Sequence, residues 1–137
     1  MAYLNAYTVN QYLQRALCAT SGGSLAVGTA IKLTTNRKTP ADLYLKVDAA
    51  GASDVVFGIV HPLDDRLLPI TDLTGGFVLP LNSAMVLVRL DNDYMQGDQL
   101  KVKTTDGKWG KIGMGEVPLL MLVENGKKDD LAWAQVL

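Results

Sequence analysis

Short apolar runs separated by turn residues dominate the chain. Runs of this length, rich in β-branched and other apolar residues, are typical of strands rather than helices. They lie at residues 25–34, 42–47, 55–60, 77–79, 84–90, 99–104, 117–123 and 131–137. Strands that follow one another without intervening helical segments predict an all-β fold, a small closed or partly open barrel or sandwich.

Two kinds of strand can be distinguished by their patterns. In residues 42–48 the apolar side chains of Leu43, Leu45 and Val47 alternate with polar ones, which predicts one buried face and one solvated face. Residues 84–90 and 118–123 are apolar on both faces. We expect these two strands to be covered on each side or to lie at a subunit contact.

One phrase of the sequence occurs twice. Residues 94–109 resemble residues 25–39 when Gly97 is aligned with Gly28, an offset of 97 − 28 = 69, which places Leu100 on Ile31 and Lys101 on Lys32. We interpret this as a duplicated strand-turn-strand unit and expect the two copies to build one closed barrel, which removes edge strands.

The rest of the alignment is looser. We expect residues 55–65 to correspond to 117–130, and residues 83–90 to correspond to 131–137. The extra length of the first half, chiefly residues 39–52 and 66–77, is then an added strand and a long loop.

Asp106 and Gly107 give the strongest hairpin signal, because glycine adopts positive φ at low cost. A two-residue loop would set Val102 opposite Lys111. A three-residue loop with a bulge would set Val102 opposite Gly110, and we favour it because it matches apolar faces. Trp109 would then be exposed beside Lys103, either as a contact residue or folded over its own strand.

The first residues differ from the rest. Leu4, Tyr7, Val9, Leu13, Ala16 and Leu17 approximate helical spacing, and the segment after Cys18 is rich in Gly and Ser. We expect an N-terminal arm or short helix with its connector over residues 1–24, followed by a single β-barrel domain over 25–137. Tyr3, Tyr7 and Tyr12 suit protein contacts, since tyrosine is enriched there. The alternative is a helix that caps its own barrel.

Composition narrows the possible partners. The 137 residues suit one domain, and 13 Lys and Arg balance 14 Asp and Glu. A nucleic-acid binder normally has a basic excess, so we expect no nucleic-acid partner. The longest apolar run after Pro118 is far short of the ~20 residues of a membrane span. We therefore expect a soluble protein made in a cytoplasm, with no signal peptide and no membrane partner.

The residues that could carry chemistry do not form a set. His61 and Cys18 are the only histidine and the only cysteine, so a transition-metal site or a disulfide within the chain is not expected. The acidic segment 91–98 does not fit a calcium loop, and the glycines of 107–117 do not fit a phosphate loop. We expect no enzymatic activity, no metal and no cofactor.

The second half resembles the small β-barrel head decoration, or cement, proteins of tailed bacteriophages. The resemblance is carried by "VLVRLDNDYMQGDQLKV", the "TDGK" hairpin, "PLLMLVENG" and the final "AWAQVL". It covers residues 84–137 well and residues 25–60 loosely. The tyrosine-rich start and the segment 66–77 depart from the family pattern.

This resemblance implies a non-enzymatic virion protein, made in the host cytoplasm, that sits on the capsid surface as a trimer and stabilises the head. The partner would be the major capsid protein. The candidate capsid or subunit contacts are Tyr3, Leu4, Tyr7, Tyr12, Leu13, Leu17 and Trp109. Two alternatives are a tail, baseplate or other minor virion protein, and a carbohydrate-binding barrel that stacks sugars on Trp109 and Trp133.

Overall fold

The computed structural model describes residues 13–34, 44–62, 67–81 and 85–137, and all of its regular elements there are strands. Their bounds are β1 Gln14–Cys18, β2 Ser24–Leu25, β3 Ala30–Leu33, β4 Leu45–Ala49, β5 Gly58–His61, β6 Ile70–Thr71, β7 Gly76–Pro80, β8 Met85–Arg89, β9 Gln99–Val102, β10 Trp109–Lys111, β11 Leu120–Leu122 and β12 Leu131–Val136. The all-β prediction is confirmed. In the described residues no helix is long and apolar enough to cross a membrane.

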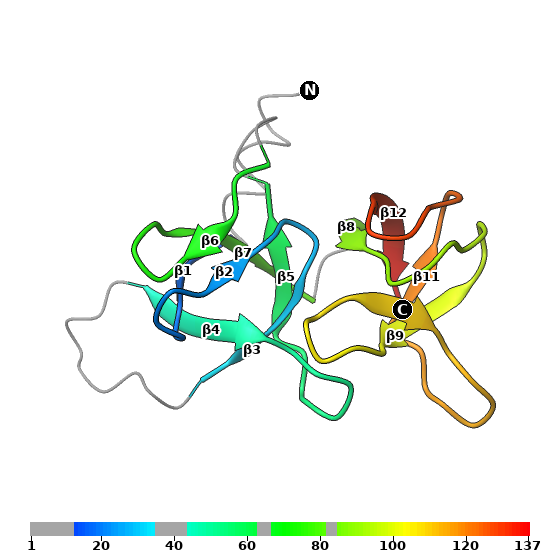
Figure 1. The fold of residues 1–137 in the computed structure, drawn as a ribbon. Helices are drawn as coiled ribbons and strands as arrows, with labels where there is room; N and C mark the ends of the chain where they lie inside the picture. Colours follow the sequence, from blue (N-terminus) through cyan, green and yellow to red (C-terminus); the bar gives the residue numbers. More distant parts are fainter. Residues whose placement is uncertain (1–12, 35–43, 63–66, 82–84) are drawn as a thin grey trace.

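The strands form two units that lie side by side (Figure 1). In the first unit, residues 14–80, a closed barrel has the order β1-β4-β3-β5-β7. In the second unit, residues 85–136, a five-stranded sheet has the order β10-β9-β11-β12-β8. Its two edge strands meet through a single parallel bridge between Leu90 and Trp109.

The two units repeat one topology. Reading the second from β8 gives β8-β10-β9-β11-β12, which matches the order of the first strand by strand. In both units the first strand runs parallel to one neighbour, β1 to β4 and Leu90 to Trp109, and the remaining pairings are antiparallel. The predicted duplication is confirmed, but each copy builds its own five-stranded unit and they do not share one barrel.

Hydrogen bonds outside the ladders repeat as well. The N–H of Gly28 donates to Val60 O and that of Gly97 to Leu122 O, at 2.9 and 2.8 Å. Both glycines have positive φ, +87° and +92°, just before the strands β3 and β9. Residues of β3 and β9 that are 69 positions apart in the sequence therefore occupy equivalent places in the two units.

Two parts of the expected alignment are wrong. Strand β8 corresponds to β1, whereas β12 corresponds to β7, because each pair occupies the same place in the strand order. The described residues of the two expected insertions, 39–52 and 66–77, have counterparts. Strand β4 holds the place of β10 in the strand order, β6 pairs with β2 as Gly126 pairs with Tyr94, and β7 begins at Gly76. Residues 14–18, expected to belong to an arm, are a barrel strand.

The units share their apolar cores. Ala30, Ala50, Ile59 and Leu79 of the first unit belong to the same buried cluster as the interior of the second. Conversely, Leu87 and Leu131 of the second unit pack against the core of the first. Strand β8 is thus covered on both faces, as its two apolar faces predicted.

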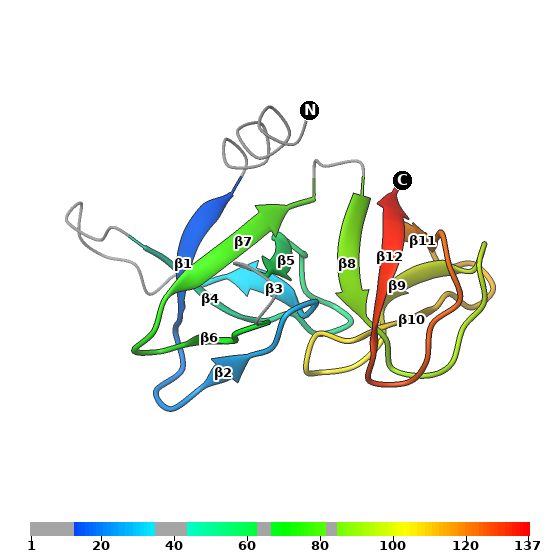
Figure 2. The same cartoon turned by 90° about the horizontal axis from the view of Figure 1, so that it is seen from above.

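Backbone contacts join the units where β2 leads into β3. Arg89 N donates to Gly28 O at 3.0 Å, and Ala30 N donates to Gly107 O at 2.8 Å. The Arg89 Nε donates to Val27 O at 3.1 Å. The first unit therefore inserts its 27–30 turn between β8 and the β9–β10 hairpin, where the ladder of the second unit would otherwise continue (Figure 2).

Candidate interaction surface

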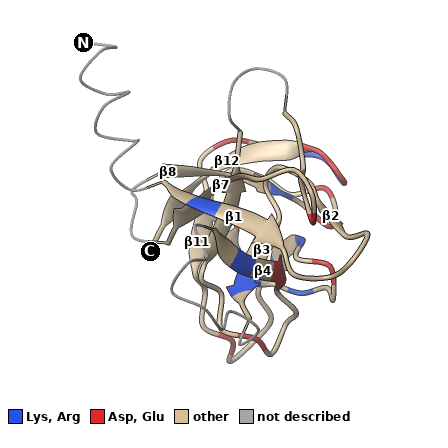
Figure 3. Ribbon diagram, turned by 90° about the vertical axis from the view of Figure 1, so that its left-hand side faces the viewer, with Lys and Arg blue, Asp and Glu red and all other residues tan. Residues whose placement is uncertain are grey.

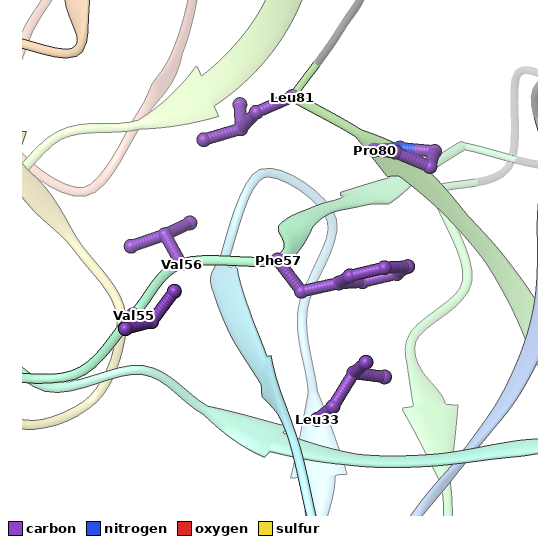
Figure 4. Close-up of a pocket in the computed structure, with 6 residues that line it drawn as sticks. All are labelled: Leu33, Val55, Val56, Phe57, Pro80 and Leu81. Atoms are coloured by element: carbon purple, nitrogen blue, oxygen red, sulfur yellow. The ribbon is translucent and has the colours of Figure 1, made fainter.

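Among the described residues, one end of the first barrel carries an apolar hollow. Strands β3 and β7 finish at this end, while β1, β4 and β5 begin there, as the antiparallel pairings and the parallel β1–β4 pairing require. A hollow of about 460 Å³ lies at this end, lined by Leu33, Val55, Val56, Phe57, Pro80 and Leu81 (Figure 4). No charged side chain is among these residues.

A carboxylate turn holds one wall of the hollow. Asp54 Oδ2 accepts the N–H of Gly51 at 2.8 Å and pairs with Lys32 Nζ at 3.1 Å. The backbone N–H of Gly51 and the Lys32 ammonium lower the pKa of Asp54. The turn is thereby tied to β3, and it presents Val55 to solvent and Val56 and Phe57 to the hollow.

The second unit carries the same turn. Glu116 accepts the N–H of Gly113 at 2.6 Å, and its Oε2 pairs with Lys101 Nζ at 3.2 Å. It also pairs with Lys103, and these groups lower its pKa from 4.5 to about 2. Val117 occupies the position of Val55, and both are exposed.

At one equivalent position the two units carry residues of different size. Val47 lies between Leu33 and Cys18 in the first barrel, and Trp109 lies between Val102 and Leu90 at the same place in the second unit. Val102 is 2% exposed, whereas Leu33 is 48% exposed. Val47 and Trp109 are both fully buried, so each completes the interior of its own unit.

Trp109 is therefore not a surface contact, and the prediction of its exposure is wrong. It is fully buried. The register of the β9–β10 hairpin sets Trp109 opposite Val102 and Lys111 opposite Leu100, neither of the two registers considered from the sequence. The loop has four residues, 104–107, and Thr104 Oγ1 accepts the Lys108 N–H at 3.0 Å. Because side chains alternate, this moves Trp109 to the interior face.

The remaining predicted contacts fall into two groups. Tyr3, Leu4, Tyr7 and Tyr12 lie outside the described residues. Leu13 and Leu17 are half-buried, and Leu13 packs against the same cluster as Val56 and Leu81 of the hollow.

The lysines near the hairpin are paired rather than free. Lys108 Nζ lies 2.7 Å from Asp129 and Lys111 Nζ lies 3.4 Å from Asp98, while Lys101 and Lys103 hold Glu116. On the face seen in Figure 3, acidic and basic segments are interspersed. The near-neutral net charge of the chain is thus accompanied by ion pairs between neighbouring acidic and basic side chains.

The candidate chemical groups, Cys18 and His61, lie in strands of the first barrel. Cys18 Sγ lies 3.5 Å from Asp48 Oδ1, and burial, together with this carboxylate, raises the pKa of its thiol. Burial lowers the pKa of His61. In the part of the chain that the structure describes, no cluster of three His, Cys, Asp or Glu side chains could hold a metal ion.

Several exposed apolar residues were not singled out from the sequence. Met114 is fully exposed, and Leu73 and Met95 are also largely exposed, each in a turn. Isolated apolar residues in turns carry no periodicity, so the sequence offered no signal for them.

Comparisons with known proteins bear on the fold. No protein-family model matches the chain, and no curated protein matches its sequence. Among solved structures, the chain is similar to the crystal structure of the N base of the head fiber gp8.5 of bacteriophage phi29. The TM-score is 0.60 at 14% sequence identity, over 91% of this chain and 92% of that chain. The two share a fold. The small β-barrel fold that the sequence resemblance implied is confirmed.

Proposed function

We propose that this chain is a non-enzymatic structural protein of a phage head, which binds the outer surface of the capsid and stabilises it. One observation carries the proposal: the chain shares its fold, over nearly its whole length, with the base of a phage head fiber. Fold alone does not determine function. The same conclusion is supported independently by the sequence resemblance to head decoration proteins.

The surface agrees with a protein-binding role. Several exposed apolar residues lie in turns, and Asp54 and Glu116 hold two of these turns in place. A preordered apolar surface loses little conformational entropy on binding. The proposed partner is the major capsid protein, and the proposed location is the capsid surface, with the tyrosine-rich segment 1–12 and Leu13 and Leu17 as contacts.

Binding to heads that lack this protein tests the proposal. Purified protein mixed with mature heads should co-sediment with them and raise their resistance to heat or to a chelator. Removal of residues 1–12 should weaken co-sedimentation by about tenfold or more, since several aromatic contacts are lost together. A Lys127→Ala variant, altered at an exposed polar position, serves as the control. Absence of co-sedimentation and of any gain in head stability would contradict the proposal.

The alternative locations can be tested by the same preparation. Immunogold labelling of virions should mark the head, and labelling confined to the tail or baseplate would favour the other virion roles. We propose that the protein acts as a trimer, which a mass measurement in solution and on heads checks. The sugar-binding alternative loses Trp109 as a stacking surface, because that indole is buried.

A further inference from the structure

Asn125 and Gly126 form a dipeptide with a chemistry of its own. Asn125 is the only asparagine of the chain that is followed by glycine. In such a pair the backbone nitrogen of the glycine can attack the side-chain amide carbon of the asparagine, because glycine has no Cβ to obstruct the approach. Asn125 is exposed, so water and hydroxide reach it. The pair is therefore a candidate deamidation site.

The reaction requires only water and hydroxide. Hydroxide removes the proton of the Gly126 nitrogen, which then bonds to Cγ of Asn125. The bond between Cγ and Nδ2 breaks, and the amide nitrogen leaves as ammonia with a proton from water, which restores the hydroxide. Water then hydrolyses the cyclic succinimide to aspartate or isoaspartate. The side-chain amide is thus replaced by a carboxylate, and in isoaspartate the main chain is longer by one methylene group.

Hydrogen bonds engage both reacting groups in the folded protein. The Gly126 N–H donates to Tyr94 O, and the Tyr94 N–H donates to Gly126 O, both at 2.9 Å. Asn125 Oδ1 accepts the N–H of Gln96 at 2.8 Å. The Gly126 nitrogen must lose its proton and turn toward Asn125 Cγ before it can attack, which breaks its bond to Tyr94. The Tyr94–Gly126 bridge therefore opposes deamidation while it is closed.

The fold requires a glycine at position 126. A Cβ there would overlap Leu90 Cδ1 and lie 2.9 Å from Ala132 Cβ. Both of these residues are fully buried in the core of the second unit. Packing thus excludes the side chain that would obstruct cyclisation, so the bridge provides the protection.

The bridge is small and lies near the surface. It is a single residue pair outside the named strands. Met95 is 68% exposed, and Gln96 is exposed as well. Segments with few buried contacts open locally at a lower free energy than the whole fold. We expect residues 94–98 to separate from residues 125–126 without global unfolding.

We propose that Asn125 is a deamidation site controlled by the Tyr94–Gly126 bridge and modified when residues 94–98 open locally. The loss of ammonia makes the change permanent, and isoaspartate shifts Gly126 relative to Tyr94, so that the original bridge does not re-form. The product therefore records that the segment has opened. This inference goes beyond the proposed function and does not depend on capsid binding.

Incubation of the full chain at mildly alkaline pH, followed by proteolysis and mass spectrometry, measures the reaction. A synthetic peptide of residues 121–130 reacts without the bridge, and the full chain should react at least about tenfold more slowly. The Asn125→Gln variant assigns the product, because its longer side chain would have to close a larger ring and should give no product on the same timescale. Reaction of the full chain at the rate of the peptide would overturn the proposal.

Two glycine variants distinguish local opening from global unfolding. Gly97 lies in the 94–98 segment and Gly115 in another turn of the second unit. Both have positive φ, and a Cβ on either would meet nothing within 4 Å. Gly97→Ala strains the segment that forms the bridge and should speed deamidation at least about fivefold. Gly115→Ala carries the same backbone strain in the other turn and should leave the rate unchanged.

Two further outcomes would contradict the proposal. Equal acceleration by both substitutions would show that modification follows global unfolding. An unchanged rate in Gly97→Ala would show that the 94–98 segment does not control the reaction. The comparison of the full chain with the peptide uses the native sequence, so it holds even where a variant fails to fold. None of these outcomes bears on whether the protein binds heads, which is measured separately.

Discussion

Gly28 and Gly97 hold the same backbone conformation in two different surroundings. Both have positive φ, and each donates its N–H to an equivalent strand, Gly28 to β5 and Gly97 to β11. A Cβ on Gly28 would lie 2.5 Å from Leu131 Cδ2 and 2.7 Å from Arg89 N, whereas a Cβ on Gly97 would meet nothing within 4 Å. A substitution at Gly97 therefore tests the strain of positive φ alone. A substitution at Gly28 tests this strain together with the close packing of the two units.

Alanine substitution at these two positions should have unequal effects. Gly97→Ala should lower the free energy of unfolding by about 1–3 kcal/mol, the cost of placing a non-glycine residue at positive φ. Gly28→Ala carries the same cost and about 1–3 kcal/mol more, because backbone atoms of the second unit must move. Urea denaturation of both variants measures the difference. Equal losses would show that the junction between the units tolerates a methyl group.

Trp109 shows why single residues could not all be placed from the sequence. The Asp106-Gly107 turn was located correctly, and Gly107 has φ of +82°. The loop is longer than expected because the Thr104 side chain caps it and because Gly107 O accepts the N–H of Ala30, a residue 77 positions earlier, 107 − 30 = 77. A contact between units cannot be read from local pattern, and a change in loop length moves every following side chain to the other face.

At the scale of elements, the two carboxylate turns are built alike. Asp54 and Glu116 each accept the N–H of a glycine three residues earlier. Asp54 also pairs with Lys32 of β3, and Glu116 pairs with Lys101 of the equivalent strand β9. Glu116 has the second lysine, Lys103, as well. These pairs are exposed, so they fix the position of a turn more than they stabilise the whole fold.

Acid should release the Glu116 turn. Its pKa in the folded protein is about 2, below the 4.5 of an ordinary glutamate, so its contribution to stability is full above pH 4.5 and disappears as the pH falls toward 2. Glu116→Gln should be less stable than the native chain at pH 6, and the gap between their denaturation midpoints should close by about pH 2. Glu124→Gln, which removes the same charge in a nearby turn, is the control. A gap that stays constant with pH would contradict this linkage.

Strand patterns predicted the elements better than their partners. All eight apolar runs contain or overlap strands, since alternation and β-branched residues report burial directly. Strand β1 escaped because residues 14–18 were interpreted as part of an arm or short helix, and β6 escaped because two residues carry little periodicity. The correspondence of β12 with β7 also escaped, because Trp133 and Phe77 share a place in the topology without sharing a sequence phrase. The hollow arises from strand ends that only the closed barrel brings together.

At the scale of the whole molecule, the two units depend on each other. Residues of each unit complete the apolar core of the other. The backbone of the turn at 27–30 also forms hydrogen bonds with the backbone of the second unit. An interface that supplies both core contacts and backbone hydrogen bonds resembles the interior of one domain more than a contact between independent domains. We therefore expect one cooperative folding unit.

Coincident unfolding transitions would establish this cooperativity. Both tryptophans, Trp109 and Trp133, lie in the second unit, so tryptophan fluorescence follows that unit alone while far-UV circular dichroism follows both. We expect the two probes to give one urea midpoint, and we expect Gly28→Ala, a change in the first unit, to lower the fluorescence midpoint as well. Gly22→Ala, a positive-φ glycine of the first unit with no atom near its Cβ, is the matched control for local strain. It should shift both probes together by a smaller amount, because it leaves the junction intact. Two separate midpoints, or a fluorescence midpoint unmoved by Gly28→Ala, would mean that the duplicated units fold independently and that their shared core contributes little to stability.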